Sequence, residues 1–281
     1  MNVLIAPMQY AFMFRGLLAV LMVGVVCASV GTFIVLRGMA FFGDALAHAI
    51  LPGIAIGYLA GSGAREPLFW GAMIAALLSS IGIGAITRRT NIRQDTAIGI
   101  VFAGMFALGI ALISTVRSYP VDLTHFLFGD VLGVSNSDLV RSAILGILVI
   151  AGIILLYKEF VVISFDPVLA VTLRLPGQLL EYVLLIMIAV TIVISLQTVG
   201  VALMVAVLVT PAAAAYLLTK RLPVMMVLAA SIAALSGVIG LYISFYANVA
   251  SGAAIVLTCT AFFILAWIGR EIQKRILVRK Q

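Results

Sequence analysis

Long apolar runs alternate with short polar segments along the whole chain. A helix needs about 20 apolar residues to cross roughly 30 Å of hydrocarbon, so a run of that length predicts one membrane span. The run Tyr182–Leu218 is about twice that length, and Gln197–Gly200 predicts a tight turn at its middle. The chain is therefore predicted to be an all-α polytopic membrane protein with nine spans. In chain order the runs are Gly16–Leu36, Gly43–Gly61, Pro67–Thr87, Thr96–Val116, Leu139–Tyr157, Tyr182–Leu218, Pro223–Tyr246 and Gly252–Gly269.

The composition excludes two other classes of protein. With 64% hydrophobic and 10% charged residues, the chain of 281 residues is too apolar for a soluble globular domain. A membrane β-barrel shows short alternating segments, not continuous apolar runs. The net charge of +7 does not indicate nucleic-acid binding, because the basic residues gather at the ends of the runs.

The positions of the basic residues predict the orientation in the membrane. Inner loops of membrane proteins carry an excess of Lys and Arg. Nine spans, with the N-terminus outside and the C-terminus inside, put 13 basic residues inside and 4 outside. The inner residues are Arg37, Arg88, Arg89, Arg93, Lys158, Arg174, Lys220, Arg221, Arg270, Lys274, Arg275, Arg279 and Lys280; the outer ones are Arg15, Arg65, Arg117 and Arg141.

The stretch Gly43–Gly53, with the sequence GDALAHAILPG, contains the clearest candidate for chemistry. Asp44 and His48 are four residues apart, so a helix places both on one face. Placing an ionisable residue in the middle of a membrane-spanning helix costs about 2.5–3.5 kcal/mol of insertion free energy, so such a residue is first interpreted as part of a functional site. Asp and His together can bind a divalent metal. The alternative is structural, with Asp44 as a helix N-cap and His48 hydrogen-bonded between helices.

Two proline positions interrupt apolar runs. Pro52 follows His48 by one helical turn, and Thr210 and Pro211 lie inside the second half of the double run. Irregular backbone at membrane depth is tolerated where it lines a cavity, so both positions are candidates for a pathway or gate. The alternative for Pro211 is an ordinary proline kink.

Two connections are too long to be simple turns. The outer one, Arg117–Asp138, contains Asp122, His125 and Asp130, which could form an acidic entry vestibule for cations or remain a solvated loop. The inner one is Lys158–Glu181. Within it, Asp166 and Pro167 predict a helix start with Asp as the cap and Pro in the first turn. That short amphipathic helix could receive a soluble partner or lie passively on the membrane face.

Several motifs of soluble enzymes do not occur in the sequence. It has no GxxxxGK[ST] phosphate-binding loop, so any ATP hydrolysis must come from a partner. It also has no HExxH or GxSxG motif, so the sequence gives no indication of the familiar metalloprotease or serine hydrolase sites. Cys27 and Cys259 both fall inside apolar runs and are interpreted as small hydrophobic residues.

The sequence resembles a known family, the membrane permease subunits of bacterial ABC importers for manganese, zinc and iron (the ABC-3 family). The resemblance covers essentially the whole chain in order. It is carried by FIVLRGMAFFGDALAHAILPGIAIGYL (33–59), DTAIGIVFAGMFALGIALIS (95–114), DLTHFLFGDVLGVSNSDL (122–139), FDPVLAVTLRLP (165–176) and SLQTVGVALMVAVLVTPAAAAYLL (195–218).

This resemblance implies a single permease domain over residues 1–281 in the bacterial cytoplasmic membrane, with a fold like that of the vitamin B12-type importers and eight or nine spans. It implies a homodimer, two cytoplasmic ATP-binding subunits and an extracellular metal-binding protein. Asp44 and His48 match the family's GDxxxHAxLPG motif and would line the pathway. The segment at about 165–177 would match the coupling helix that meets the ATPase. The residues expected to make that contact are Asp166, Pro167, Leu169, Leu173, Arg174 and Pro176.

The cargo implied is a divalent transition metal, most similar to manganese-type members because of HAxLPG, with zinc and iron as alternatives. One Asp oxygen and one His nitrogen are too few to hold an ion, but a two-fold axis doubles them, and mixed O and N ligands suit Mn²⁺. No permanently bound cofactor is expected. The alternative functions are an ion-coupled secondary transporter with Asp44 and His48 as a relay, and an intramembrane enzyme.

Overall fold

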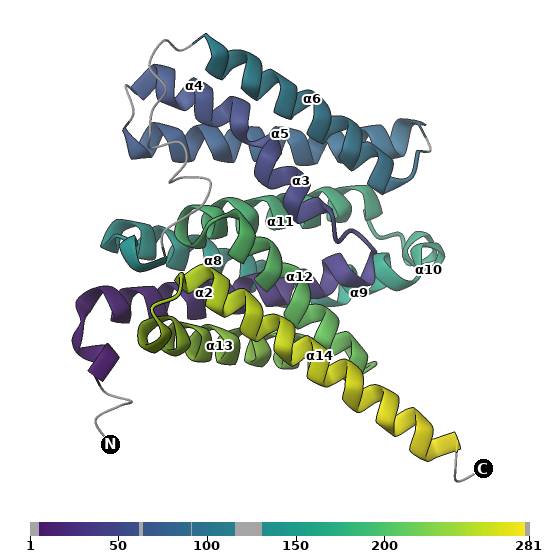
Figure 1. Ribbon diagram of the computed structural model, residues 1–281. Coiled ribbons are helices and arrows are strands. Elements are labelled where there is room, and N and C mark those ends of the chain that lie inside the picture. The colour runs from purple at the N-terminus through teal and green to yellow at the C-terminus, as the bar shows by residue number, and fades with distance from the viewer. Residues whose placement is uncertain (1–5, 62–63, 91, 116–130, 279–281) are drawn as a thin grey trace.

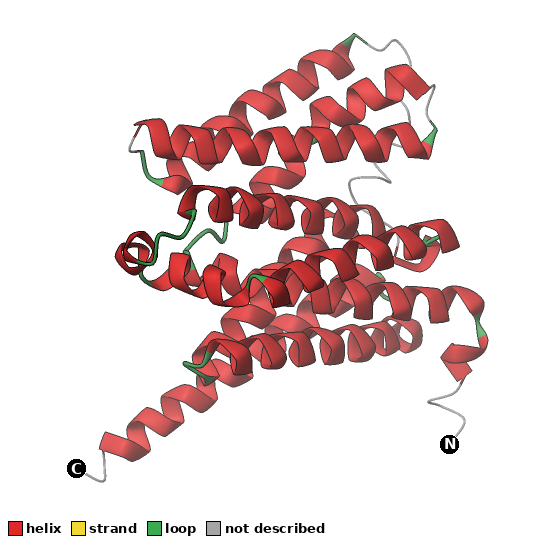
Figure 2. Cartoon of the chain, turned by 180° about the vertical axis from the view of Figure 1, so that it is seen from behind, coloured by secondary structure: helices red, strands yellow, loops and turns green. Residues whose placement is uncertain are grey.

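The computed structural model describes residues 6–61, 64–90, 92–115 and 131–278, and within them the chain folds into helices without strands (Figures 1 and 2). The two 3₁₀ helices are η1 (Ala6–Gln9) and η2 (Val131–Gly133). The α-helices are α2 (Ala11–Leu36), α3 (Phe42–Ala49), α4 (Leu51–Gly61), α5 (Arg65–Thr90), α6 (Gln94–Ser114), α8 (Asn136–Leu155), α9 (Tyr157–Phe165), α10 (Pro167–Thr172), α11 (Gly177–Val199), α12 (Val201–Leu218), α13 (Leu222–Ala247) and α14 (Ser251–Val278).

The described part of the chain has nine helical segments that are long and apolar enough to cross a membrane, which confirms the predicted number. α3 and α4 together form one of them, Phe42–Gly61. The predicted division of the double run is also confirmed, because Gly200 alone separates α11 from α12. Its φ of 82° lies in the region that glycine adopts without steric cost.

The helices form two groups, which meet where α5 packs against α11 and where α3 passes between them (Figure 1). α4, α5 and α6 pack against one another on one side, and α2 packs against α8, α11, α12 and α13 on the other. The short helix α3 contacts α5 and α6 in the first group and α11 and α12 in the second. The candidate stretch therefore lies at the junction of the two groups.

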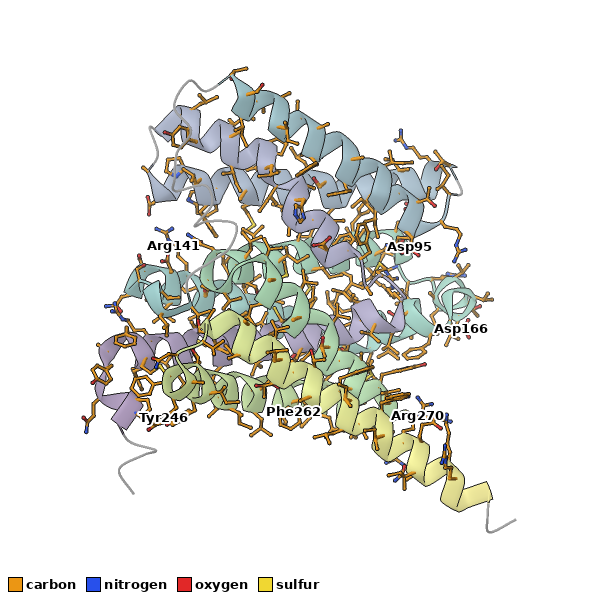
Figure 3. All side chains as sticks on the ribbon, viewed as in Figure 1. Asp95, Arg141, Asp166, Tyr246, Phe262 and Arg270 are labelled. Atoms are coloured by element: carbon orange, nitrogen blue, oxygen red, sulfur yellow. The ribbon has the colours of Figure 1, made fainter. Side chains whose placement is uncertain are left out.

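Two sets of ion pairs, at opposite ends of the bundle, agree with the predicted orientation. Glu181 at the start of α11 contacts both Arg37, which follows α2, and Arg88 near the end of α5, and all three were predicted on the inner side. Glu66 contacts Arg141, and both were predicted on the outer side. Figure 3 shows the same division, with Arg141 at the end of the molecule opposite Asp166 and Arg270.

The inner connection is more ordered than the sequence predicted. Lys158–Glu181 was expected to be a connection with one short helix, but it contains α9, α10 and the first turn of α11. α9 is amphipathic enough to bury Phe160 and Ile163. Its apolar residues are too few to extend a span, which is why the run-length criterion did not find it.

Candidate functional site

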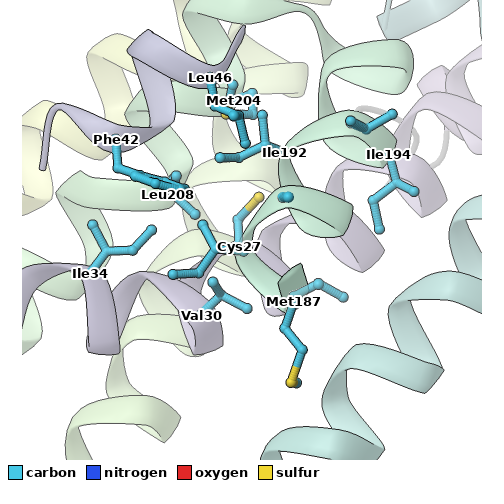
Figure 4. Close-up of a cluster of buried hydrophobic side chains, with 14 of the residues drawn as sticks. Cys27, Val30, Ile34, Phe42, Leu46, Met187, Ile192, Ile194, Met204 and Leu208 are labelled. Atoms are coloured by element: carbon cyan, nitrogen blue, oxygen red, sulfur yellow. The ribbon is translucent and has the colours of Figure 1, made fainter. Parts of the chain in front are cut away.

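The sequence of α3 places its apolar and polar residues on different sides of the helix. Phe42 and Leu46, four residues apart, are fully buried. They pack over Leu208 and Met204 of α12 in the central apolar cluster (Figure 4). The side chains of Asp44 and His48 also share one side, and they are 40% and 34% exposed. α3 is therefore anchored through its apolar side and presents a carboxylate and an imidazole on the other.

Asp44 and His48 are held by a local hydrogen bond that leaves their ligand atoms available. The Nδ1 atom of His48 lies 2.9 Å from the backbone carbonyl oxygen of Asp44. A carbonyl oxygen only accepts, so Nδ1 carries the hydrogen in this bond. In a neutral imidazole the Nε2 lone pair is then free, which is the form that binds a metal. The carboxylate Oδ1 of Asp44 is 3.8 Å from Nδ1 and is not committed to it.

Two phenylalanines of α6, which the sequence did not single out, orient the ring of His48. The centroids of Phe102 and Phe106 lie 5.9 and 5.7 Å from the imidazole centroid, at interplanar angles of 85° and 73°. Such edge-to-face contacts stabilise a ring in one orientation. Phe41, which directly precedes α3, packs edge-on against Phe102 and extends this aromatic flank. In the sequence, the feature that could have indicated this contact was the four-residue spacing of Phe102 and Phe106, which places both rings on one face of a helix.

The structural alternative for Asp44 is wrong in one respect. The residue preceding the first turn of α3 is Phe41, and no side-chain cap hydrogen bond occurs there. Asp44 is the third residue of the helix. Its carboxylate nevertheless lies in the first turn, where the helix dipole favours a negative charge.

Pro52 is buried and follows directly on the start of α4 at Leu51. Proline has no N–H, so it cannot donate to the carbonyl of His48 four residues earlier. The interruption between α3 and α4 at Ile50 has this cause. The predicted discontinuity beside His48 is thus present, and whether it gates a pathway stays a prediction.

The second predicted discontinuity does not interrupt its helix. α12 is continuous through Pro211, which is buried, while Thr210 is partly buried. The helix remains close to the site: a Cβ added to Gly43, next to Asp44, would lie 2.8 Å from Leu208 of α12. The break expected at Thr210 and Pro211 is absent, because one missing backbone hydrogen bond is tolerated when the rest of the helix is packed. A proline inside a continuous helix is compatible with the alternative of an ordinary proline kink, and a pathway or gate role for the two residues stays a prediction.

The outer-loop candidates Asp122, His125 and Asp130 lie outside the described residues. Within the residues that are described, no group of three or more His, Cys, Asp or Glu side chains could hold a metal ion. A single chain thus supplies the Asp44 and His48 pair and no larger cluster in that part of the structure.

The predicted inner helix forms as expected. Oδ1 of Asp166 accepts a hydrogen bond from the N–H of Leu169 at 2.9 Å, and Pro167 is the first residue of α10. The helix ends at Thr172, and Arg174 adopts a left-handed φ of 54°. Its apolar side chains are outward: Leu169 is 42% and Leu173 54% exposed. Exposed apolar surface occurs where a protein meets another protein or a membrane, and which of the two α10 meets stays a prediction.

An ionic cluster, which sequence reasoning missed, joins the start of α11 to α5 and to the end of α2. The Nη2 atom of Arg88 donates to Glu181 and lies 3.4 Å from the carbonyl oxygen of Gly177, the first residue after α10 and its short link. Arg37 lies 3.7 Å from the same carboxylate. These residues are far apart in sequence. The distribution of basic residues therefore predicted on which side of the membrane they lie, but not that they contact one another.

Comparison with known proteins gives consistent similarities. Residues 9–270 match the ABC 3 transport family. The chain is 48% identical over 261 residues to the manganese transport system membrane protein MntC of Listeria monocytogenes, covering 93% of this chain and 91% of that protein. It is 39% identical over 272 residues to a probable iron transport system membrane protein of Haemophilus influenzae, covering 97% and 98%. A chain in the solved structure of PsaBC from Streptococcus pneumoniae in complex with Fab superposes with a TM-score of 0.81 at 38% identity, covering 94% of each chain.

Proposed function

This chain belongs to the ABC 3 transport family, and we propose that Asp44 and His48 form its metal-translocation site, with Mn²⁺ as the preferred cargo. The protein is the permease subunit of an ATP-driven importer of divalent transition metals, a multi-pass protein of the plasma membrane. ATP hydrolysis takes place in a separate subunit of such importers.

The observation that carries the site assignment is the hydrogen bond between Nδ1 of His48 and the carbonyl of Asp44. It fixes the tautomer that exposes Nε2, while the carboxylate one turn away stays uncommitted. The aromatic contacts with Phe102 and Phe106 hold the imidazole in place before an ion arrives. A pre-oriented pair costs less ordering on binding than two free side chains.

Two copies of the chain would complete the ligand set. The pair from one chain gives one oxygen and one nitrogen donor, and a two-fold axis beside α3 would give four positions, with water filling the rest. Mixed carboxylate, imidazole and water ligation suits Mn²⁺ and admits Fe²⁺ and Zn²⁺. The partial exposure of both side chains in one chain is consistent with a second copy facing them. Incomplete protein ligation also favours release, which a transport site requires.

Manganese is proposed as the cargo because the similar Listeria protein bears that name, and the name of the Haemophilus protein makes iron the first alternative. An extracellular metal-binding protein would deliver the ion. On the opposite side, α10 would receive the ATP-binding subunit through Leu169 and Leu173, whose apolar side chains are exposed.

Metal stoichiometry tests this proposal directly. The purified permease, in complex with its ATP-binding subunit, is titrated with Mn²⁺ while free Mn²⁺ is followed by electron paramagnetic resonance. We expect binding to saturate at one ion per two permease chains, with displacement by Fe²⁺ or Zn²⁺ in competition. One ion per chain, or unchanged binding in an Asp44→Asn and His48→Gln double variant, would contradict the shared site. Preferential binding of Zn²⁺ or Fe²⁺ with the same stoichiometry would support the shared site and show that the preferred cargo is not Mn²⁺.

A further inference from the structure

A partly polar cavity lies at the predicted inner end of the bundle, away from α3. It has a volume of about 230 Å³, and its lining comes from the ends of α2, α9 and α12, the start of α13 and the side of α14. Two cations line it, Lys220 after α12 and Arg270 on α14, together with the side chains of Tyr216 and Thr219. Its remaining walls are apolar and include Leu36 and Phe165. A cavity whose lining combines cations and hydroxyl-bearing residues with apolar residues suits an amphiphilic anion.

The two cations are not paired with protein carboxylates in the described part of the chain. Each ion pair found there involves other basic residues, and neither Lys220 nor Arg270 takes part. Glu271, the carboxylate next to Arg270, lies 2.8 Å from Lys274 instead. Two cations lining one cavity repel each other, and an anion between them removes that repulsion.

Aromatic residues indicate the depth of this cavity in the bilayer. Tyr216, in the last turn of α12 and four residues before Lys220, is 52% exposed, and Trp267, one turn before Arg270 on α14, is 54% exposed. Exposed Tyr and Trp are typical of the boundary between headgroups and acyl chains. Lys220 and Arg270, which lie further toward the inner side, then come to the level of the lipid phosphates. Figure 3 shows Arg270 where α14 begins to extend beyond the rest of the bundle.

We infer that this cavity binds the phosphate of an anionic phospholipid from the inner leaflet. Lys220 and Arg270 would donate charge-assisted hydrogen bonds to the phosphate oxygens, and the hydroxyl groups of Tyr216 and Thr219 would add neutral ones. Basic pockets between transmembrane helices on the inner side have the chemistry to hold such headgroups. The volume is below the range of about 300–1,000 Å³ that is usual for drug-sized ligands. It therefore suits a headgroup, with the acyl chains outside along exposed apolar residues such as Leu265.

The inference is tested with the full-length permease in detergent, by native mass spectrometry during titration with phosphatidylglycerol or phosphatidylcholine. Both lipids carry the phosphate, but only phosphatidylglycerol has a net negative charge. We expect preferential binding of phosphatidylglycerol and a fall of about 30-fold in its affinity in a Lys220→Gln and Arg270→Gln double variant, from about fivefold for each lost cation. The matched control is Arg89→Gln with Arg93→Gln, two exposed arginines on the same predicted side that do not line the cavity.

The control pair should keep its affinity for phosphatidylglycerol within about threefold, since a general charge effect would lower both double variants equally. If the first double variant does not fold, as judged by size-exclusion chromatography, the single variants Lys220→Gln and Arg270→Gln give the same comparison. Equal loss in test and control variants would overturn the inference. So would displacement of the lipid by glycerol phosphate, which indicates a free-anion site, or by the ATP-binding subunit, which indicates a protein contact.

Discussion

Gly53 on α4 and Gly71 on α5 lie so close that neither position has room for a side chain. A Cβ added to Gly53 would lie 2.0 Å from the carbonyl oxygen of Gly71, and one added to Gly71 would lie 2.1 Å from the carbonyl oxygen of Gly53. Small residues let two membrane helices approach until their backbones touch. Gly53 ends the stretch that contains Asp44 and His48, so this contact fixes the helix that follows the proposed site.

We expect Gly53→Ala or Gly71→Ala to destabilise the permease by about 1–3 kcal/mol or more, because the obstructing atoms are backbone and cannot rotate away. The matched control is Gly82→Ala on α5, where an added Cβ meets nothing within 4 Å. That change should be neutral or stabilising by up to about 1 kcal/mol, since Ala has the higher helix propensity. Thermal unfolding in detergent measures the three variants. Equal midpoints for Gly53→Ala and Gly82→Ala would show that the helices can separate freely.

The proposed metal ligands predict a loss of transport without a loss of assembly. Asp44→Asn and His48→Gln should each lower uptake of radioactive Mn²⁺ by at least about 100-fold in vesicles containing the complete importer, because changing only the partner of a ligand already costs about 10–100-fold. Asp95→Asn is the control, an exposed carboxylate in the first turn of α6. Copurification of the ATP-binding subunit should be unchanged in all three. Transport at the wild-type rate by either ligand variant would leave Asp44 and His48 with a structural role.

The exposed apolar residues of α10 predict where the ATP-binding subunit attaches. Leu169→Asp or Leu173→Asp should lower its retention on the purified permease by at least about tenfold, since a buried leucine contributes about 1.5–3 kcal/mol and a buried charge adds a further cost. Thr172→Asp is the control for added charge, because Thr172 is an exposed polar residue on the same helix. Equal loss of the subunit in the Thr172 variant would mean that charge alone disturbs the surface. Full retention in the leucine variants would make α10 a passive surface element.

The ionic cluster at the inner end predicts a stabilising role for Glu181. Glu181→Gln removes the carboxylate shared by Arg37 and Arg88, and the side chain of Arg37 is only 12% exposed. Breaking a buried pair costs about 3–5 kcal/mol, and the partial exposure of this cluster reduces the expected loss to about 1–3 kcal/mol. Glu271→Gln, in a more exposed pair with Lys274, should have little effect. Thermal unfolding at low and high salt compares the two, and equal midpoints would show that the cluster contributes nothing.

The sequence alone determined the number of spans, because it contains eight apolar runs of which one, Tyr182–Leu218, is long enough for two spans. It also located some short local features. Asp166 and Pro167 predicted the start of α10, and the turn expected at Gln197–Gly200 predicted the separation of α11 and α12, which the structure places at Gly200 alone. Helix caps, turns and span lengths depend on neighbours in sequence, so a linear pattern contains the information they need. Asp44 and His48 were found for the same reason, as polar residues one turn apart in an apolar run.

The tertiary structure decided what surrounds those residues. Phe102 and Phe106 meet His48 from a different helix, and Glu181 meets Arg88 from 93 residues away. It also showed that Pro211 leaves α12 unbroken, whereas Pro52 marks the start of α4. In a membrane, helix faces toward lipid and toward protein are similarly apolar, so hydrophobicity does not reveal which helices touch. Those contacts depend on shape, such as the backbone approach of Gly53 and Gly71, and shape exists only once the helices are packed.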